Sequence, residues 1–304
     1  MEKKEFKIVV CLKVIHLLCS ERGFDRIKRT IDPEYLVKMV NPADEYALEM
    51  ALLLKERIEE RRGHAEIFVL SIAPNSDEEI LRRALAMGAD SAFRIWEEGF
   101  ETLNAMALAY LLSVTISRVG GDLIFCGKKS SDMNGNEVGG YLAEFLHLPQ
   151  VSEVTSLNMS QEGDRMICRR KMERWGWDLV ETSTPVVLTV ERGENEPRYP
   201  NLFSILNWLE KEVKILDTAS LGIDKNRLKE WDSLVRVIEW NRPKPKKVFT
   251  PKSDLPPEER IRLALTGGIE QKKAKFLLGE AREIVSQVVD LLLRQKILKT
   301  GGEK

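Results

Sequence analysis

The sequence predicts an α/β fold built on a doubly wound, mostly parallel sheet with helices on both faces. Short apolar segments without polar alternation recur through the first half, as expected of strands that are covered on both faces. Segments with helical patterning separate them, and a polar, glycine-containing turn follows the segment Leu123–Cys126. With 304 residues, of which 43% are hydrophobic, the chain can form a substantial core.

The first half alternates strands and helices in the order typical of a Rossmann-like sheet. We expect strands over Phe6–Val14, Ile67–Ile72, Ala92–Trp96 and Leu123–Cys126. We expect the helices between and after them to begin near Asn41, Ser76, Glu101 and Asn136.

The helix at Asn41 has the clearest local signals. Asn41 is a favourable N-cap, Pro42 suits the first helical position, and Asp44 places a negative charge in the first turn. Apolar residues then recur at helical spacing until two arginines and Gly63 end the pattern.

The second half has a different pattern, with short β-like runs and proline-rich segments. Four short β-like runs, which we expect to form an antiparallel extension of the same sheet, span 151–158, 166–172, 179–182 and 186–190. Proline-rich segments at Arg242–Lys247 and Pro251–Pro257 suggest an extended arm, and Glu280–Ile297 has the pattern of an amphipathic terminal helix. We therefore divide the chain into an α/β domain, residues 1–224, and a C-terminal linker with a helical arm, residues 225–304.

Composition excludes several classes of function. The formal net charge of −1 gives no electrostatic basis for nucleic-acid or anionic membrane binding. The apolar run Leu103–Val119 is interrupted by polar residues and is too short to span a membrane, so we expect a buried helix. The charged N-terminus does not resemble a secretory signal, and we expect a cytoplasmic protein. Four dispersed cysteines without a C-x-x-C pair disfavour a metal centre.

A candidate nucleotide crevice lies where the first and fourth strands end, at Cys11–Lys13 and Cys126–Lys128. If these strands are neighbours, both ends and the helix beginning at Asn41 line one crevice. Glycines, serines and asparagines in 127–138 offer close backbone approach and hydrogen bonds to a phosphate. Such a turn also occurs as a simple helix cap, and neither G-x-G-x-x-G nor a P-loop is present.

Five segments together resemble the β subunit of electron transfer flavoproteins over roughly residues 6–224. They are KIVVCLKV, NPADEYALEMALLLKE, LRRALAMGAD, DLIFCGKKSSD followed by LAEFLHLPQ, and NEPRYPNLFSIL. The resemblance implies the adenine nucleotide alpha hydrolase-like form of the fold and a heterodimer whose α subunit holds FAD. Electrons would pass between a dehydrogenase or NADH and an acceptor. The β subunit itself would bind AMP in the conventional group, or a second FAD in the electron-bifurcating group.

The same resemblance implies the residues that bind the nucleotide and no catalytic residue of the chain's own. Glu137 and Asn134 depart from the family's usual Gln and Asp, which alters the charge of the loop. Val14–Leu18 replaces a common Val-Pro-Asp loop near the flavin, and Leu18 either contacts the flavin or packs against a neighbour. The expected cofactor-binding residues are Cys11, Leu12, Lys13, Asn41, Pro42, Ala43, Asp44, Ile72, Gly127, Lys128, Lys129, Ser130, Ser131, Asp132, Met133, Asn134, Gly135, Asn136, Glu137 and Val138.

Residues Asn195–Ile205 are similar to the family's recognition loop, which docks on an acyl-CoA dehydrogenase or a quinone oxidoreductase type of partner. Arg198, Tyr199 and Leu202 are the expected partner-binding residues, although a strand-to-helix connection packed on its own domain is the alternative. The run LLGEAREIVSQVVDLLLRQKIL resembles the bifurcating branch, which favours FAD over AMP and implies an arm that packs on the α subunit. We assign no role to residues 251–270.

Two other function classes remain compatible with the residues. A stand-alone adenine-nucleotide-binding enzyme or sensor of similar topology would turn over or respond to ATP without a partner. An assembly scaffold would bind no nucleotide at all.

Overall fold

The computed structural model describes residues 5–20, 23–25, 30–160, 165–172, 176–208, 211–235, 238, 250–265 and 279–294. They fall into two compact units, Met1–Ile238 and Glu239–Lys304. The expected proline-rich segment Arg242–Lys247, residues 266–270 and the last three residues of the expected terminal helix lie outside the described residues.

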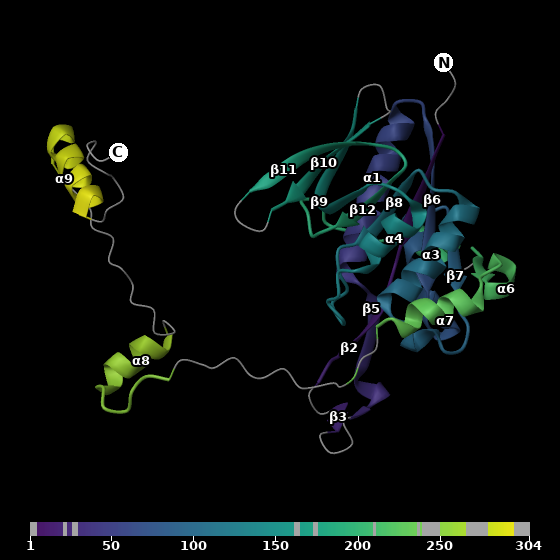
Figure 1. The fold of residues 1–304 in the computed structure, drawn as a ribbon, viewed down its shortest axis with the longest axis horizontal. Coiled ribbons are helices and arrows are strands. Elements are labelled where there is room, and N and C mark those ends of the chain that lie inside the picture. The colour runs from purple at the N-terminus through teal and green to yellow at the C-terminus, as the bar shows by residue number, and fades with distance from the viewer. Residues whose placement is uncertain are drawn as a thin grey trace. The chain divides into compact units, whose positions relative to one another are not determined.

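A nine-stranded sheet forms the centre of the first unit, in the order β11-β10-β9-β12-β8-β1-β6-β7-β13 (Figure 1). Its strands are β1 (Glu5–Cys11), β6 (His64–Ile72), β7 (Ser91–Ile95), β8 (Leu123–Gly127), β9 (Gln150–Met159), β10 (Arg165–Lys171), β11 (Trp177–Ser183), β12 (Val186–Val190) and β13 (Val213–Leu216).

The parallel part of the sheet is doubly wound around β1. The chain first proceeds from β1 to β6 and β7 on one side, and then crosses to β8 on the other side of β1. All of these pairs are parallel, with Cys11 opposite Leu70 of β6 and Cys126 of β8. The winding direction therefore reverses between β1 and β8, and the predicted fold class is confirmed.

The antiparallel extension is shorter than the sequence suggests. Strands β9, β10 and β11 pair in antiparallel fashion, as expected. The prediction was wrong for residues 186–190, because β12 lies parallel to both β8 and β9. All five residues of β12 are buried, which is the burial expected of a strand inside a parallel sheet rather than at its margin.

Helices cover both faces of the sheet. The apolar stripes of α1 and α2 pack on one face, and those of α3, α4, α6 and α7 pack on the other. Each of the four helices expected in the first half is present, although three begin two to four residues later than predicted. The helices of this unit are α1 (Pro42–Glu60), α2 (Glu78–Met87), α3 (Ala105–Val119), α4 (Val138–Leu146), α5 (Leu202–Trp208), α6 (Thr218–Leu221) and α7 (Lys225–Ser233).

The first strand is shorter than the predicted Phe6–Val14. Its pairing in the sheet ends at Cys11, and the chain then turns into β2 (Val14–Leu18), which pairs with β5 (Leu36–Val40) in a separate hairpin. The continuous apolar run concealed this break, because Val14 and Ile15 are buried as well. Two short strands, β3 (Phe24–Asp25) and β4 (Thr30–Ile31), pair between β2 and β5.

The second unit contains two described helices, α8 (Pro257–Leu265) and α9 (Ala281–Arg294). The predicted terminal helix is confirmed over α9, where Ile284, Val285, Val288 and Val289 recur at helical spacing. Among the described residues, no helix is both long and apolar enough to cross a membrane.

Candidate functional site

The carboxyl ends of β1 and β8 lie side by side, as the crevice hypothesis requires. Cys11 and Cys126 are opposite each other in the parallel register. Helix α1 packs on both strands and on β6, with its N-terminus following Asn41. Three segments distant in sequence therefore meet at the point where the winding reverses, which is where open α/β sheets bind ligands.

Asp44 joins the two strand ends. Its carboxylate accepts hydrogen bonds from the backbone N–H of Lys13 (2.7 Å) and of Gly127 (2.8 Å). The side chain of Asp44 is buried, with 5% exposed. A Cβ atom on Gly127 would lie 2.2 Å from Asp44 Oδ1 and 2.8 Å from the Cβ of Ala43. Residue 127 is therefore a glycine because α1 approaches the strand end so closely.

Asn41 fastens the loop after β8 to the same helix. Its Nδ2 donates to the carbonyl of Lys129 (3.0 Å), and its Oδ1 accepts from the backbone N–H of Ser131 (3.1 Å). The predicted N-cap position is correct, but no side-chain cap bond forms there because the side chain is committed to the loop.

A second link crosses the crevice between side chains. Lys13 Nζ lies 2.8 Å from Asp132 Oδ1 and donates to Ser130 Oγ at 3.3 Å. Burial raises the pKa of Asp132, but its hydrogen bonds to Lys13 and Ser130 outweigh that effect and the pKa is lowered overall. The charge of Lys13 is thus largely balanced within the crevice.

Burial also controls ionisation at the bottom of the crevice. It raises the pKa of Asp44 to about 7, although hydrogen bonds from Lys13 and Gly127 act in the opposite direction. Burial and the neighbouring Cys126 raise the pKa of the Cys11 thiol well above its ordinary range, and burial raises that of Cys126 to about 12. Both cysteines are therefore neutral packing residues at neutral pH rather than nucleophiles.

The loop between β8 and α4 supplies exposed polar groups. Residues 131–137 are exposed, and Asn134 and Asn136 have left-handed backbone conformations with φ of 55° and 60°. Helix α4 begins at Val138, and no side-chain hydrogen bond caps its N-terminus. A Cβ on Gly140 would meet only Gln150 Oε1, at 3.9 Å. Uncapped N–H groups, hydroxyls and amides beside open space fit the phosphate and ribose of an adenine nucleotide.

The other expected binding residues are dispersed around this loop. Leu12 is buried and Ile72, at the end of β6, is half-buried, so their side chains contribute apolar packing. Lys128 lies 3.0 Å from Glu153 and 3.4 Å from Glu191, in an ion pair beside β9 and β12. Its positive charge is therefore compensated by two carboxylates. Exposed residues of the loop include Lys129, Met133, Gly135 and Glu137, while Pro42 and Ala43 in the first turn of α1 are half-buried.

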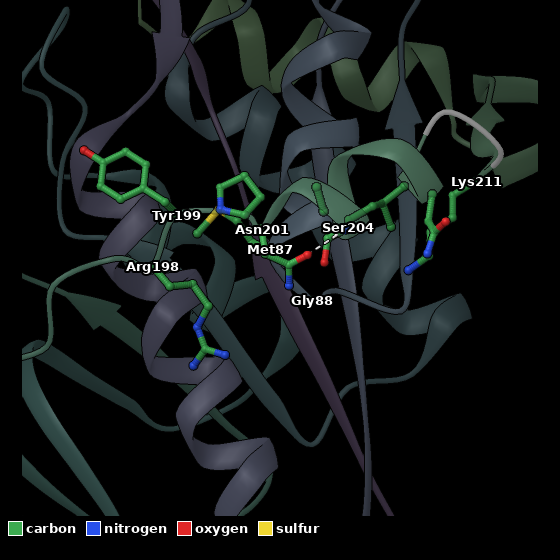
Figure 2. Close-up of a pocket in the computed structure, with 11 residues that line it drawn as sticks. Met87, Gly88, Arg198, Tyr199, Asn201, Ser204 and Lys211 are labelled. Carbon is green, nitrogen blue, oxygen red and sulfur yellow. Dashed lines mark hydrogen bonds between the residues drawn. The ribbon is translucent and has the colours of Figure 1, made fainter.

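The expected partner segment is irregular in its first part and helical in its second. Residues 191–201 contain neither helix nor strand, and α5 begins at Leu202, inside the segment expected to be a loop. Tyr199 is 87% exposed and Leu202 is 68% exposed. Arg198 instead turns towards α1, where it meets Glu49 and Glu56. Figure 2 shows Arg198 and Tyr199 pointing in different directions from neighbouring positions of the chain.

Two cavities lie beside α5 rather than at the strand ends. One, of about 280 Å³, is lined by the end of α2, by Tyr199 and Asn201, and by Lys211 (Figure 2). The other, of about 350 Å³, lies between β5, α2 and α5 and includes Asp77 and Trp208. The nucleotide hypothesis rests on the strand ends and α4, and not on these cavities.

Sequence reasoning missed the acidic residues that hold Arg198. Glu49 and Glu56 are seven residues apart on α1, and Glu49 falls among the apolar residues of the buried stripe. That position was the available signal, because a carboxylate on a buried helix face needs a cationic partner.

The chain is similar to one family of known proteins. A family described as "Electron transfer flavoprotein domain" matches residues 30–220. The chain is 36% identical over 225 residues to "Electron transfer flavoprotein subunit beta" of Thermoanaerobacterium thermosaccharolyticum, covering 74% of this chain and 84% of the relative. It belongs to the electron transfer flavoprotein beta-subunit family.

Two further members of this family are informative. The beta subunit of Clostridium acetobutylicum is 34% identical over 221 residues, covering 73% of this chain and 82% of the relative. That of Megasphaera elsdenii is 28% identical over 299 residues, covering 96% of this chain and 100% of the relative. The similarity to the electron transfer flavoprotein beta subunit of M. elsdenii therefore extends through the C-terminal unit.

Proposed function

We propose that this chain is the β subunit of a heterodimeric electron transfer flavoprotein and binds an adenine nucleotide at the β1/β8 crevice. The observation that supports it most directly is the junction built by Asn41 and Asp44. These two side chains hold both strand ends and the polar loop in one arrangement, next to the uncapped start of α4. Family membership supplies the expectation of a flavin.

The residues of the chain bind and orient rather than react. The first turn of α4 offers backbone N–H groups to phosphate, and we assign the hydrogen bonds to hydroxyl and phosphate oxygens to Ser130, Ser131, Asn134 and Asn136. Cys11, Leu12 and Ile72 supply apolar surface at the strand ends. FAD, when bound, supplies the electron-carrying chemistry.

We favour FAD over AMP in this crevice, and with it an electron-bifurcating role that uses NADH. The C-terminal run resembles that branch of the family. We further propose that the C-terminal arm packs on the α subunit, because the apolar residues of α9 recur along one helical face. The α subunit carries FAD in this scheme, and the surface around Tyr199 and Leu202 receives an acyl-CoA dehydrogenase or quinone oxidoreductase partner.

Coexpression with the α subunit tests the proposal. The expected product is a yellow heterodimer, purified without added flavin and analysed for flavin and adenine nucleotide after acid extraction. Two FAD per heterodimer support bifurcation, whereas one FAD and one AMP support conventional transfer. A colourless monomer that hydrolyses ATP would refute the flavoprotein proposal in favour of a stand-alone enzyme, and a product with no nucleotide would indicate a scaffold.

A further inference from the structure

An exposed apolar surface surrounds the start of α5. Four large apolar side chains on it are unusually exposed for neighbouring residues of a folded domain. Tyr199 is 87% exposed, Leu202 68%, Phe203 79% and Leu206 57%. They come from one short stretch of chain, which is too short to hold its own orientation on the domain. The residues that tie this stretch to the domain therefore decide how the surface is presented.

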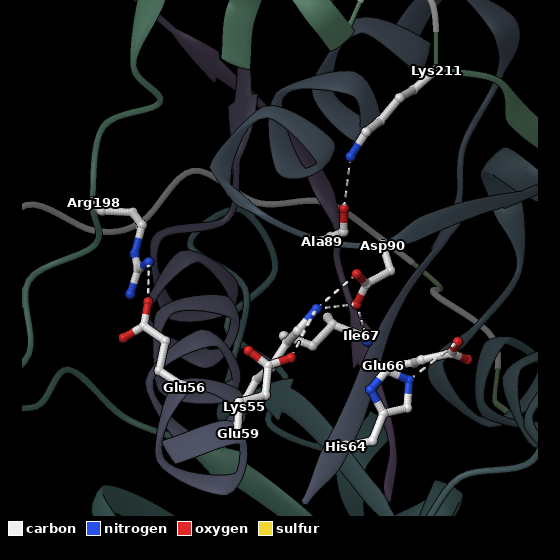
Figure 3. A network of polar contacts seen from close by, with 10 residues as sticks. All are labelled: Lys55, Glu56, Glu59, His64, Glu66, Ile67, Ala89, Asp90, Arg198 and Lys211. Carbon is white, nitrogen blue, oxygen red and sulfur yellow. Dashed lines mark hydrogen bonds and ion pairs between the residues drawn. The ribbon is translucent and has the colours of Figure 1, made fainter. Parts of the chain in front are cut away.

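Arg198 provides the tie at the upstream end. Its backbone N–H and its guanidinium bind the same carboxylate: the N–H donates to Glu49 Oε2 at 3.0 Å, and Nε donates to both oxygens at 2.9 and 3.1 Å. Nη2 adds a bond to Glu49 Oε1 at 2.8 Å, and Nη1 donates to Glu56 Oε1 at 2.6 Å. One residue thus attaches main chain and side chain to α1. Figure 3 shows the contact between Arg198 and Glu56.

The pairing of Arg198 with α1 joins a forked cation to a buried carboxylate. Glu49 is buried, with 4% exposed, and the hydrogen bonds described for its carboxylate all come from Arg198. Glu56 follows two turns later on the same face of α1, so that a planar, forked guanidinium spans the two carboxylates. A lysine in place of Arg198 has a single point charge and cannot make the same set of bonds.

The downstream end of α5 has its own support. Lys211 Nζ donates to the carbonyl of Ala89 at 3.4 Å, and Arg82 donates to the carbonyl of Lys211 at 3.3 Å. At the upstream end, Asn201 caps α5 by accepting from the backbone N–H of Ser204 at 2.8 Å. The two contacts of Lys211 hold the downstream end of the helix to the α2 side, and the direction of residues 198–200 is left to Arg198.

We propose that Arg198 is a positioning residue for partner docking: its pairing with Glu49 and Glu56 holds residues 198–201 on α1, so that the exposed apolar surface is presented in one arrangement. The proposal rests on the proposed function, in which an acyl-CoA dehydrogenase meets this surface. In this proposal Arg198 holds the segment in place within its own domain, and Tyr199, Leu202 and Phe203 contact the partner.

The two roles predict different mutant patterns. If Arg198 positions the surface, Glu49→Gln disturbs docking as much as Arg198→Gln, although Glu49 is buried and cannot touch a partner. The double variant then loses no more than the larger single loss, because both changes break the same pair. If Arg198 contacts the partner directly, Glu49→Gln has little effect and Arg198→Gln alone weakens docking.

Two measurements on the purified heterodimer, obtained by coexpression with the α subunit, test this proposal. Hydrogen–deuterium exchange of peptides spanning 199–208 reports the order of the surface without any docking partner. We expect both single variants to exchange at least about tenfold faster there, with the β1 and β8 peptides unchanged, and Arg198→Lys to lie between. Steady-state electron transfer from a purified acyl-CoA dehydrogenase should show a higher KM for that protein at unchanged kcat.

Lys55→Gln is the matched control. Lys55 lies on the same helix and pairs with Asp90 at 2.7 Å, so its loss costs α1 an ion pair without touching Arg198. It should leave both measurements unchanged. If Glu49→Gln fails to fold, Glu56→Gln replaces it in the exchange measurement, which contains no docking partner that the half-exposed Glu56 could touch.

Unchanged exchange over 199–208 in the glutamine variants would overturn the proposal, as would a KM effect confined to Arg198→Gln. Failure of the proposed function gives a different result: the protein coexpressed with the α subunit would then transfer no electrons in any variant, while the exchange result would still stand.

Discussion

The buried carboxylate of Asp44 makes the stability of this protein depend on pH in an unusual direction. Its two backbone hydrogen bonds favour the ionised form, but burial outweighs them and raises the pKa from 3.8 to about 7. The folded state therefore holds a proton on Asp44 at pH values where the unfolded chain has lost it. The stabilising contribution is complete below about pH 4 and is lost as the pH rises through about 7.

Asp44→Asn removes this titration while keeping the size of the side chain. At about 1.4 kcal/mol for each pH unit between the two pKa values, the free energy of unfolding of the wild type should fall by about 4 kcal/mol relative to the variant between pH 3 and pH 8. The difference between the two proteins is the informative quantity, because it cancels all carboxyl groups that both chains share.

Urea unfolding of both chains, followed by far-ultraviolet circular dichroism at intervals of half a pH unit, measures that difference. Asp132→Asn is the matched control, because the pKa of Asp132 is lowered and its loss should change the pH dependence in the opposite direction. Parallel stability profiles for the wild type and Asp44→Asn would refute the reasoning and show that the two backbone hydrogen bonds stabilise the charge as fully as water does.

Three further predictions concern the crevice and the partner surface. Gly127→Ala places a methyl group against Asp44 and should cost about 1–3 kcal/mol of stability by urea unfolding, whereas Gly135→Ala, whose nearest neighbour lies 4.0 Å away, should cost much less. Asn41→Ala should loosen the loop and weaken nucleotide retention at least about tenfold by equilibrium dialysis, with a loss of about 1–2 kcal/mol of stability. Leu202→Ala should raise the KM for an acyl-CoA dehydrogenase without lowering the melting temperature, because the side chain is 68% exposed.

The sequence predicted those parts of the fold that depend on local pattern. The strands at Ile67 and Leu123 and the helix after Asn41 carry unbroken signals of burial, capping and periodicity, and all three are present. The strand at residues 186–190 was given the wrong direction because an apolar run of five residues carries no information about its neighbours. Direction is determined by the connections between strands and by pairing with distant residues, which local patterning does not contain.

For the candidate site too, the sequence could predict some features and not others. The ends of β1 and β8 could be brought together from a topological rule, and Asn41 and Asp44 could be named in advance. Their hydrogen-bond partners could not, because Asp44 reaches backbone groups 31 and 83 residues away. Such contacts depend on how closely α1 approaches the sheet. That distance follows from the packing of the whole core rather than from any short stretch of sequence.

Helix α1 connects the two functional regions that the proposals place on this chain. Its N-cap residue Asn41 and Asp44 in its first turn hold the crevice together, and Glu49 and Glu56 hold the partner segment further along. At 1.5 Å per residue, Asp44 and Glu56 are roughly 18 Å apart along a continuous helix whose apolar residues are buried in the core. A packed helix of this length transmits displacement with little bending. The order of the partner segment should therefore respond to changes at the crevice. Asp44→Asn should alter hydrogen exchange over 199–208 above pH 7, where the wild-type carboxylate is ionised and the asparagine amide is neutral. Unchanged exchange there would show that the two ends of α1 act independently.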